Sequence, residues 1–342
     1  MLLDQVARLF PVSRYFVSHV GGQRHELTWD GDATIRCLLG EDRVTHWLCQ
    51  KDADGLMRMT CREGRFGQED GGLEETLLAV LESAFYFYQG EDSFYLDVSY
   101  LNDAFLERYA QLDRLRLPRV ERNLFWQRPE LWLPNVQKGV SYGTIQSLSR
   151  SPLKHQGAVG VTYRRFIPWL GRTFSFRGIR IEEDLERFSR WMNDPFVSHF
   201  WEEQGSLDRH RSYLNDKQVD QNILTLLACL DDQPFGYFEV YWAKYDRIAP
   251  FCDAEEHDRG WHALIGEEDC RGKTYVCSWL PSLTHYLFLD DERTKRIVVE
   301  PRVDNDRMTN NLIRADYHLV KEFDFPHKKA NLFEVSRSWL LS

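Results

Sequence analysis

Apolar residues in the second half of the chain repeat with the periods of regular secondary structure. They alternate with polar residues over 174–181, which predicts a strand, and recur at helical spacing over 182–192, where acidic residues occupy the first turn. Residues 193–195 (NDP) end this helix, because a proline disfavours helical geometry in the residue before it. A second helix is predicted over 207–221. The pattern therefore opens with one strand and two helices.

The apolar runs that follow are shorter and more continuous, as in buried strands. They predict strands over 225–230, 235–242, 261–265, 296–300, 320–325 and 332–335, and helices over 274–289 and 306–315. The resulting order, β-α-α-β-β-β-α-β-α-β-β, is typical of a mixed sheet with helices on its faces. The predicted fold class is therefore α/β, in the mixed α+β sense.

The first half of the chain has strand-like pieces and one clear helix, over 73–85. Prolines are frequent between 118 and 172, which is typical of an extended segment on the surface. We therefore expect an amino-terminal α+β accessory domain over 1–150, a connector over 151–172 and a second domain over 173–342.

Composition narrows the class of protein. A chain of 342 residues is long enough for two domains, and its formal net charge of -10 argues against a general nucleic-acid surface. The seven cysteines include no C-x-x-C pair, which disfavours disulfides and a structural metal site. The first ten residues do not read as a signal peptide, and no apolar run approaches the roughly 20 residues of a membrane span. We expect a cytoplasmic protein with no membrane, nucleic-acid or metal partner.

His262 and Glu300 are the most informative candidate pair. His262 lies in the predicted strand 261–265, and Glu300 ends the predicted strand 296–300, with one helix between them. Two strands joined through a helix can bring an imidazole and a carboxylate to one cleft, an arrangement suited to removing a proton from a nucleophile. A buried strand histidine beside a surface acid explains the same residues, and taken alone it is the stronger interpretation.

Seven stretches, taken in order, together resemble one family, and they favour the catalytic interpretation of His262 and Glu300 over the structural one. They are 190–195 (RWMNDP), 200–202 (FWE), 237–243 (YFEVYWA), 258–266 (DRGWHALIG), 284–286 (THY), 299–305 (VEPRVDN) and 321–328 (KEFDFPHK). Residues 174–335 are similar to the siderophore-biosynthesis branch of the GNAT acyltransferases, especially the aerobactin-type N6-hydroxylysine acetyltransferases. The resemblance implies the GNAT fold and an acyltransferase activity for 173–342. Over 1–150 it is faint, and we hypothesise there a degenerate copy of the same fold that shapes the acceptor cleft.

The resemblance also implies a coenzyme, acetyl-CoA or succinyl-CoA, as acyl donor. This superfamily holds the pyrophosphate with backbone N–H groups of a loop that leads into a helix amino terminus, where the helix dipole favours an anion. Residues 270–275 (CRGKTY) take that place, with one glycine where the family has more. The implied CoA-binding residues are Leu264, Ile265, Arg271, Gly272, Lys273, Thr274 and Asn305.

In such an enzyme His262 is the implied general base, directly or through a water, and Glu300 orients and charge-balances the imidazole. Many members of the superfamily carry a tyrosine seven residues after the asparagine matched by Asn305, where it protonates the leaving thiolate. This chain has Leu312 at that position. The general acid is therefore unassigned.

The implied acceptor is N6-hydroxylysine, acetylated on its hydroxylated nitrogen to give a hydroxamate for siderophore biosynthesis. We expect substrate contacts from Trp191, Asn193, Trp201, Glu239, Tyr241 and Trp242, although strand alternation places Trp242 on the opposite face from Glu239 and Tyr241. Glu202, Glu239 or Asp246 is available for the α-ammonium. His327 and Lys328 could reach the acceptor carboxylate or CoA, but a solvated hairpin is favoured there.

Two alternatives stay open. The acceptor could be N-hydroxyputrescine or N-hydroxycadaverine, with succinyl-CoA or acetyl-CoA as donor, for a macrocyclic siderophore. A lysine-derived acceptor needs a cation near its carboxylate, whereas a diamine does not. The alternative of another class is a non-catalytic acyl-CoA-binding scaffold, against which the presence of both His262 and Glu300 speaks. The expected partners are a small hydroxylamine substrate and other enzymes of the siderophore pathway.

Overall fold

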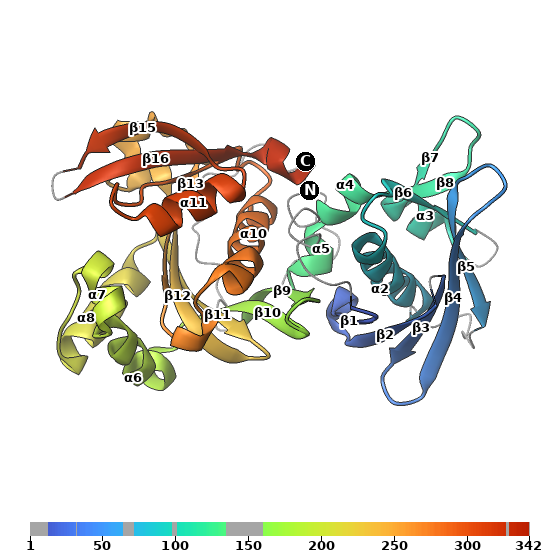
Figure 1. The fold of residues 1–342 in the computed structure, drawn as a ribbon, viewed down its shortest axis with the longest axis horizontal. Coiled ribbons are helices and arrows are strands. Elements are labelled where there is room, and N and C mark those ends of the chain that lie inside the picture. The colour runs from blue at the N-terminus through green and yellow to red at the C-terminus, as the bar shows by residue number, and fades with distance from the viewer. Residues whose placement is uncertain are drawn as a thin grey trace.

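Two eight-stranded sheets form the computed structural model of the chain, which describes residues 13–31, 33–63, 72–97, 101–134, 160–325 and 328–341. The sheets come from the two halves of the chain and lie side by side along its long axis (Figure 1). None of the helices in the described ranges is both long and apolar enough to cross a bilayer. The first ten residues, 151–159 of the expected connector and the candidate contact His327 lie outside these ranges.

The second sheet has the strand order β9-β10-β11-β12-β13-β14-β16-β15. Its strands are β9 (Val161–Ile167), β10 (Arg172–Gly178), β11 (Ile223–Leu230), β12 (Gln233–Trp242), β13 (Arg259–Ile265), β14 (Arg296–Val299), β15 (His318–Asp324) and β16 (Lys329–Ser336). Its helices are α6 (Ile181–Met192), α7 (Pro195–Trp201), α8 (Leu207–Val219), α9 (Ala249–Cys252), α10 (Lys273–Asp290) and α11 (Asp306–Arg314). The predicted mixed sheet is confirmed, and every element predicted from the periodicity of this half is present.

One segment of the expected connector is part of this sheet. Residues 161–167 form β9, an edge strand paired antiparallel with β10. Residues 118–134, which we expected to lie extended on the surface, form a strand and two short helices that bury Trp126 and Trp132. The expectation of an extended surface segment is therefore wrong for both stretches, because the aromatic residues among the prolines pack into the core.

The strands β13 and β14 create an opening in the sheet. They are parallel and joined through α10, and they pair only at Arg259 with Ile297 and at Gly260 with Val298. Beyond Gly260 the two strands diverge, so residues 261–265 of β13 have no partner on the β14 side. Side chains of this stretch and the start of α10 are therefore accessible from within the sheet.

The first sheet repeats this topology, with the order β1-β2-β3-β4-β5-β6-β8-β7. Its strands are β1 (Tyr15–Ser18), β2 (His25–Asp30), β3 (Thr34–Leu39), β4 (Arg43–Lys51), β5 (Met57–Glu63), β6 (Ser93–Leu96), β7 (Gln111–Leu112) and β8 (Pro118–Glu121), with helices α2 (Gly72–Phe87), α3 (Asp103–Tyr109), α4 (Arg122–Trp126) and α5 (Pro129–Trp132). As in the second sheet, the fifth and sixth strands are the one parallel pair among those described, and a long helix, α2, connects them. The two halves therefore share one strand order and one crossover.

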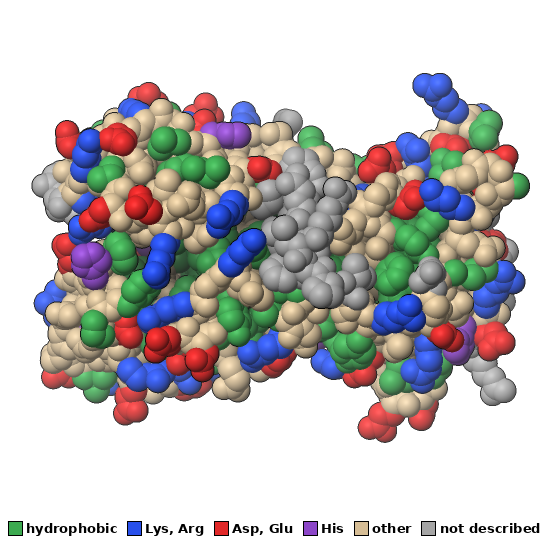
Figure 2. Space-filling view, viewed as in Figure 1, with side chains coloured by type: hydrophobic (Ala, Val, Ile, Leu, Met, Phe, Trp, Pro, Cys, Tyr) green, Lys and Arg blue, Asp and Glu red, His purple; other side chains and the backbone are tan. Residues whose placement is uncertain are grey.

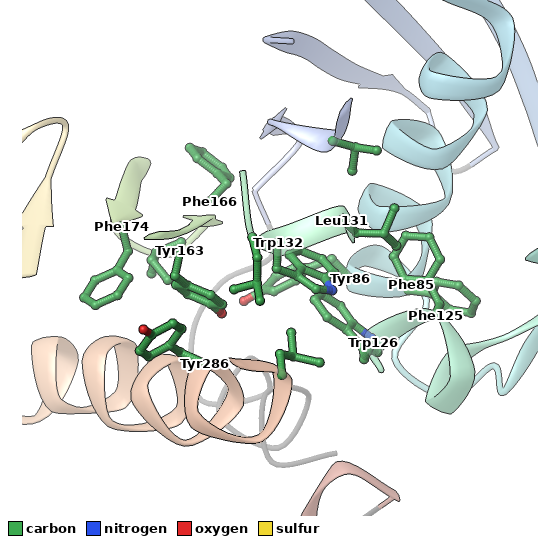
Figure 3. Close-up of a cluster of buried hydrophobic side chains, with 14 of the residues drawn as sticks. Phe85, Tyr86, Phe125, Trp126, Leu131, Trp132, Tyr163, Phe166, Phe174 and Tyr286 are labelled. Carbon is green, nitrogen blue, oxygen red and sulfur yellow. The ribbon is translucent and has the colours of Figure 1, made fainter. Parts of the chain in front are cut away.

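An aromatic core joins the two halves (Figure 3). Trp126 and Trp132 of the first half stack with their ring centroids 4.5 Å apart. The buried imidazole of His285 on α10 lies against them, with Nε2 2.7 Å from the Trp126 carbonyl and Nδ1 2.9 Å from the Tyr163 hydroxyl. Because these contacts are buried, they hold α10 against the first half.

Candidate active site

His262 is held between two carboxylates from neighbouring strands. It faces Glu239 across the β12–β13 pair, and its Nδ1 lies 3.3 Å from Glu239 Oε2. Its Nε2 lies 3.1 Å from Oε1 of Glu300, the residue that follows β14. Both carboxylates are nearly fully buried, while 23% of the His262 side chain is exposed. The structure therefore brings together His262 and Glu300, as the sequence predicted, and adds a second acid.

Three further groups bind Glu239. The hydroxyls of Tyr213 and Tyr237 donate to its Oε1 at 2.6 Å and 3.0 Å, and Lys217 Nζ donates to its Oε2 at 3.0 Å. Tyr213 and Lys217 project from successive turns of α8, the spacing that places two side chains on one helix face. Glu239 therefore has its hydrogen-bonding capacity filled from within the protein and is not available for a substrate ammonium.

Glu300 has its own partners on the other side of His262. The Tyr241 hydroxyl donates to its Oε2 at 3.1 Å. Lys328 Nζ donates to the Glu300 backbone carbonyl at 2.9 Å and lies 3.7 Å from Oε1. Only 16% of the Lys328 side chain is exposed, so the expectation of a solvated hairpin is wrong for this residue.

The charges of this cluster fix its protonation. Burial lowers the pKa of His262, but Glu300 and Glu239 outweigh it and raise that pKa to about 9. Burial raises the pKa of both acids, but His262 and the neighbouring lysines lower each to about 2. At neutral pH the resting site therefore holds an imidazolium with a proton on each nitrogen, between two ionised carboxylates.

The stability of the protein is expected to depend on pH through this cluster. The pKa of His262 is raised from 6.5 to about 9, so its contribution is complete below pH 6.5 and is lost as the pH rises through 9. We expect the free energy of unfolding to fall by roughly 2 kcal/mol more in the wild type than in His262→Gln between about pH 5.5 and 9.5. Urea unfolding at both pH values measures this free energy. An equal decrease in the two proteins would contradict the raised pKa of His262.

A cavity of about 1040 Å³ lies beside His262, between α7, β13 and the amino-terminal ends of α10 and α11. Six of the predicted CoA-binding residues line it: Leu264, Ile265, Arg271, Gly272, Lys273 and Asn305. Trp201 also lines it, and its ring centroid is 6.4 Å from that of His262. Figure 2 shows lysine and arginine side chains around a hollow with hydrophobic side chains inside it.

The amino terminus of α10 fits an anionic group such as the CoA pyrophosphate. Its N-cap, Gly272, has a φ of 109° and no side chain that satisfies the first N–H groups of the helix. A side chain does so at α11, where Asn305 accepts from the Met308 N–H. Lys273 adds a positive charge to the lining of the cavity, whereas the Arg271 guanidinium is bound to the carbonyls of Ile265 and Gly266.

The remaining predicted residues do not all face this site. Trp242 lies in the main core on the opposite face of β12, where Arg259 stacks on its ring, so the expected substrate contact is wrong. Trp191 is buried and its indole N–H donates to Glu267, and Asn193 binds the backbone of Gly205. Thr274 does not line the cavity, and its carbonyl accepts from the Trp169 indole.

Several groups at the site have no recognisable motif in the sequence. Among them are Tyr213 and Lys217, and the signal that could have found them is their four-residue spacing on one predicted helix. In the described part of the chain, no residue of the first half lines the cavity or bonds to His262. The hypothesis that the first half shapes the acceptor cleft is therefore not supported there.

Comparison with known proteins places the chain in a family. The acetyltransferase (GNAT) domain matches residues 180–325. A Schizosaccharomyces pombe protein named as a lysine N-acyltransferase is 43% identical over 65% of this chain and 67% of its own length. An Escherichia coli N6-hydroxylysine O-acetyltransferase is 42% identical over 64% of this chain and 70% of its own length.

Two further matches are partial. A Beauveria bassiana N5-hydroxyornithine:cis-anhydromevalonyl coenzyme A-N5-transacylase is 42% identical over 52% of this chain and 39% of its own length. The crystal structure of an uncharacterised Bacillus halodurans protein matches 54% of this chain and 97% of its own with a TM-score of 0.50 and 25% identity. The domain match, the relatives and the fold agree, and the chain belongs to the siderophore-biosynthesis branch of the GNAT acyltransferases.

Proposed function

We propose that the chain transfers an acetyl group from acetyl-CoA to the hydroxylated side-chain nitrogen of N6-hydroxylysine, giving a hydroxamate. One observation carries the proposal: a histidine held between two buried carboxylates lies beside a cavity that begins at an uncapped helix amino terminus. When bound, acetyl-CoA supplies the activated acyl group as a thioester. Gly272, Lys273 and the first turn of α10 would hold its pyrophosphate, and Leu264 and Ile265 would line the path towards His262.

His262 has two protons to manage in this reaction. The hydroxylamine nitrogen is weakly basic and mostly neutral at pH 7, so it attacks the thioester carbon without prior deprotonation. The C–S bond then breaks, and the departing thiolate takes a proton from the His262 imidazolium, one N–H of which turns from its carboxylate partner to the sulfur. Once the C–N bond has formed, the proton on the attacking nitrogen is acidic. The neutral imidazole accepts this proton, which restores the imidazolium.

The protonation of the resting site supports this sequence. A His262 pKa of about 9 lies close to the ordinary thiol value of about 8.5, so proton transfer to the thiolate is nearly balanced. The same value leaves little neutral imidazole at pH 7, which disfavours a role as base alone. No tyrosine is needed where Leu312 is buried, because His262 already carries the proton.

We also propose an origin for the first half of the chain and a cellular context for the reaction. The identical strand orders of the two sheets support an origin of residues 1–150 as a second copy of the fold, followed by a connector and the acyltransferase domain. Lysine must first be N-hydroxylated, and the hydroxamate must then be joined to a scaffold. We therefore infer that the chain works beside other siderophore-pathway enzymes, in the cytoplasm.

The product distinguishes this reaction from its alternatives. We expect thiol release from acetyl-CoA with N6-hydroxylysine, and a product that forms a coloured Fe(III) hydroxamate complex. Since the name of the Escherichia coli relative places the acetyl group on oxygen, the iron assay matters. An O-acetyl product releases thiol but binds no iron as a hydroxamate, and it would contradict transfer to nitrogen. Faster turnover with succinyl-CoA would favour the macrocyclic-siderophore alternative, and no turnover with any donor would favour the scaffold.

A further inference from the structure

Most charged side chains around His262 already neutralise one another. Lys217 is bound to Glu239, and Lys328 to Glu300. Arg302 pairs with Glu202 at 3.1 Å and with Asp304 at 2.8 Å. Of the acids that the sequence offered for a substrate ammonium, Glu239 and Glu202 are therefore occupied. Only Asp246 remains.

Asp246 and Arg247 follow β12 and the short 3-10 helix η3 (Ala243–Tyr245). The Asp246 carboxylate accepts a hydrogen bond from the Ile248 N–H at 3.0 Å, its one hydrogen bond within the described residues, and it forms no ion pair there. Burial raises its pKa, His262 and Arg247 lower it, and Glu300 raises it. Its second carboxylate oxygen is therefore free to bind a ligand within electrostatic reach of the catalytic cluster.

The Arg247 guanidinium has no carboxylate or hydrogen-bond partner in the described part of the chain. It lies 5.6 Å from the centre of the Phe325 ring, and Lys328 Nζ lies 5.5 Å from the same centre. Because Lys328 contacts Glu300, Phe325 connects Arg247 to the site. An exposed arginine stacked on an aromatic ring keeps its five N–H donors available for a planar anion.

The two residues follow the end of β12 that pairs with Arg259 and Gly260, whereas the CoA cavity is lined by Ala263, Leu264 and Ile265 at the other end of β13, beyond His262. Neither lines that cavity, and neither do Tyr241 and Glu300. Ile248, next to Arg247, packs instead with Tyr241 and Phe325 in a separate apolar cluster. A donor thioester and an acceptor can therefore approach His262 from different sides.

We propose that Asp246 and Arg247 bind the α-ammonium and the α-carboxylate of the acceptor, so that the enzyme selects an N-hydroxylated amino acid over an N-hydroxylated diamine. The inference rests on the proposed function and names the residues that set its substrate class. An amino acid presents one negative and one positive group on the same carbon, and the adjacent Arg247 and Asp246 present the complementary pair. Arginine binds a carboxylate through two parallel N–H···O contacts. A diamine has no carboxylate for Arg247 to bind.

Three acceptors separate the two contacts in a steady-state assay with acetyl-CoA. N6-hydroxylysine has both head groups, N-hydroxycadaverine keeps only the ammonium, and 6-hydroxyaminohexanoate keeps only the carboxylate. We expect Arg247→Gln to lower the preference for N6-hydroxylysine over N-hydroxycadaverine, as a ratio of kcat/KM, by about 10- to 100-fold, mainly through KM. Asp246→Asn should instead lower the preference for N6-hydroxylysine over 6-hydroxyaminohexanoate.

Arg247→Lys keeps the charge and should restore part of the ratio, while Arg211→Gln on the outer face of α8 should leave it unchanged. Arg211 is a matched control because its ion-pair partner among the described residues is the exposed Glu182. Acylation of N6-hydroxylysine with a ratio that Arg247→Gln does not change would overturn the inference and leave the proposed function intact. If the wild type acylates none of the three acceptors, the proposed function itself fails.

Discussion

Replacing His262 with alanine is expected to lower kcat by about 10²- to 10⁴-fold, the range that a lost proton-transfer residue gives. Among the described residues, His262 is the one titratable group in contact with both Glu239 and Glu300, and its ring lies near that of Trp201, which lines the cavity. The uncapped turn of α10 and Lys273 do not depend on it. The dissociation constant for CoA should therefore change by no more than about twofold.

Thiol release measures kcat, and calorimetric titration measures CoA binding. His318→Ala is the matched control, since His318 is an exposed histidine on the edge strand β15. The variant removes the cation from between two buried acids, so its free energy of unfolding must be measured to show that it is folded at the assay temperature. A folded His262→Ala protein that turns over at the wild-type rate would exclude His262 from proton transfer.

The second half of the fold could be predicted because its periodicity is strong. Each predicted strand and helix after residue 174 is present, since a strand buried on one face and a helix buried on one side must repeat apolar residues at their own periods. Residues 118–172 were harder. Their prolines indicate extended chain, but tryptophans and tyrosines placed among them pack between the sheets, and packing outweighs local propensity.

Part of the site could be predicted and part could not. His262, Glu239 and Tyr241 follow from alternation on adjacent strands, whereas Trp242 belongs to the other face by the same rule. Lys217 and Arg247 reach the site from a helix and a turn, and no local pattern encodes which surface charge will face a buried acid. Pairwise distances decide that question, and they depend on the whole fold.

The two halves share a topology but not a set of polar site residues, which explains why no functional motif could be recognised in the first half. The two sheets have the same strand order and one parallel crossover each among the described strands. The register position that holds Glu239 and His262 in the second half needs polar residues only for catalysis. Once catalysis is lost from a copy, only the apolar pattern remains under constraint, and that pattern is common to many mixed sheets.

Glu300→Gln is expected to lower kcat by about 10- to 100-fold at pH 8 and to move the alkaline fall of activity to lower pH. Glutamine keeps the shape of the side chain but removes the charge 3.1 Å from His262 Nε2. Burial then lowers the pKa of His262 with only Glu239 left to raise it, so the value falls from about 9 towards 6.5. The imidazole loses its proton earlier and can no longer protonate the thiolate.

The pH dependence of kcat between about pH 6 and 10 tests this. In the wild type kcat should stay level up to pH 9 and fall above it, because the acid form of His262 is required and its pKa is about 9. If His262 acted as a base alone, kcat would instead rise with pH up to about pH 9. Glu334→Gln is the matched control, since Glu334 pairs with Arg296 away from His262. A Glu300→Gln profile that falls at the same pH as the wild type would show that Glu300 does not hold the imidazolium, and the proton would then have to come from another group.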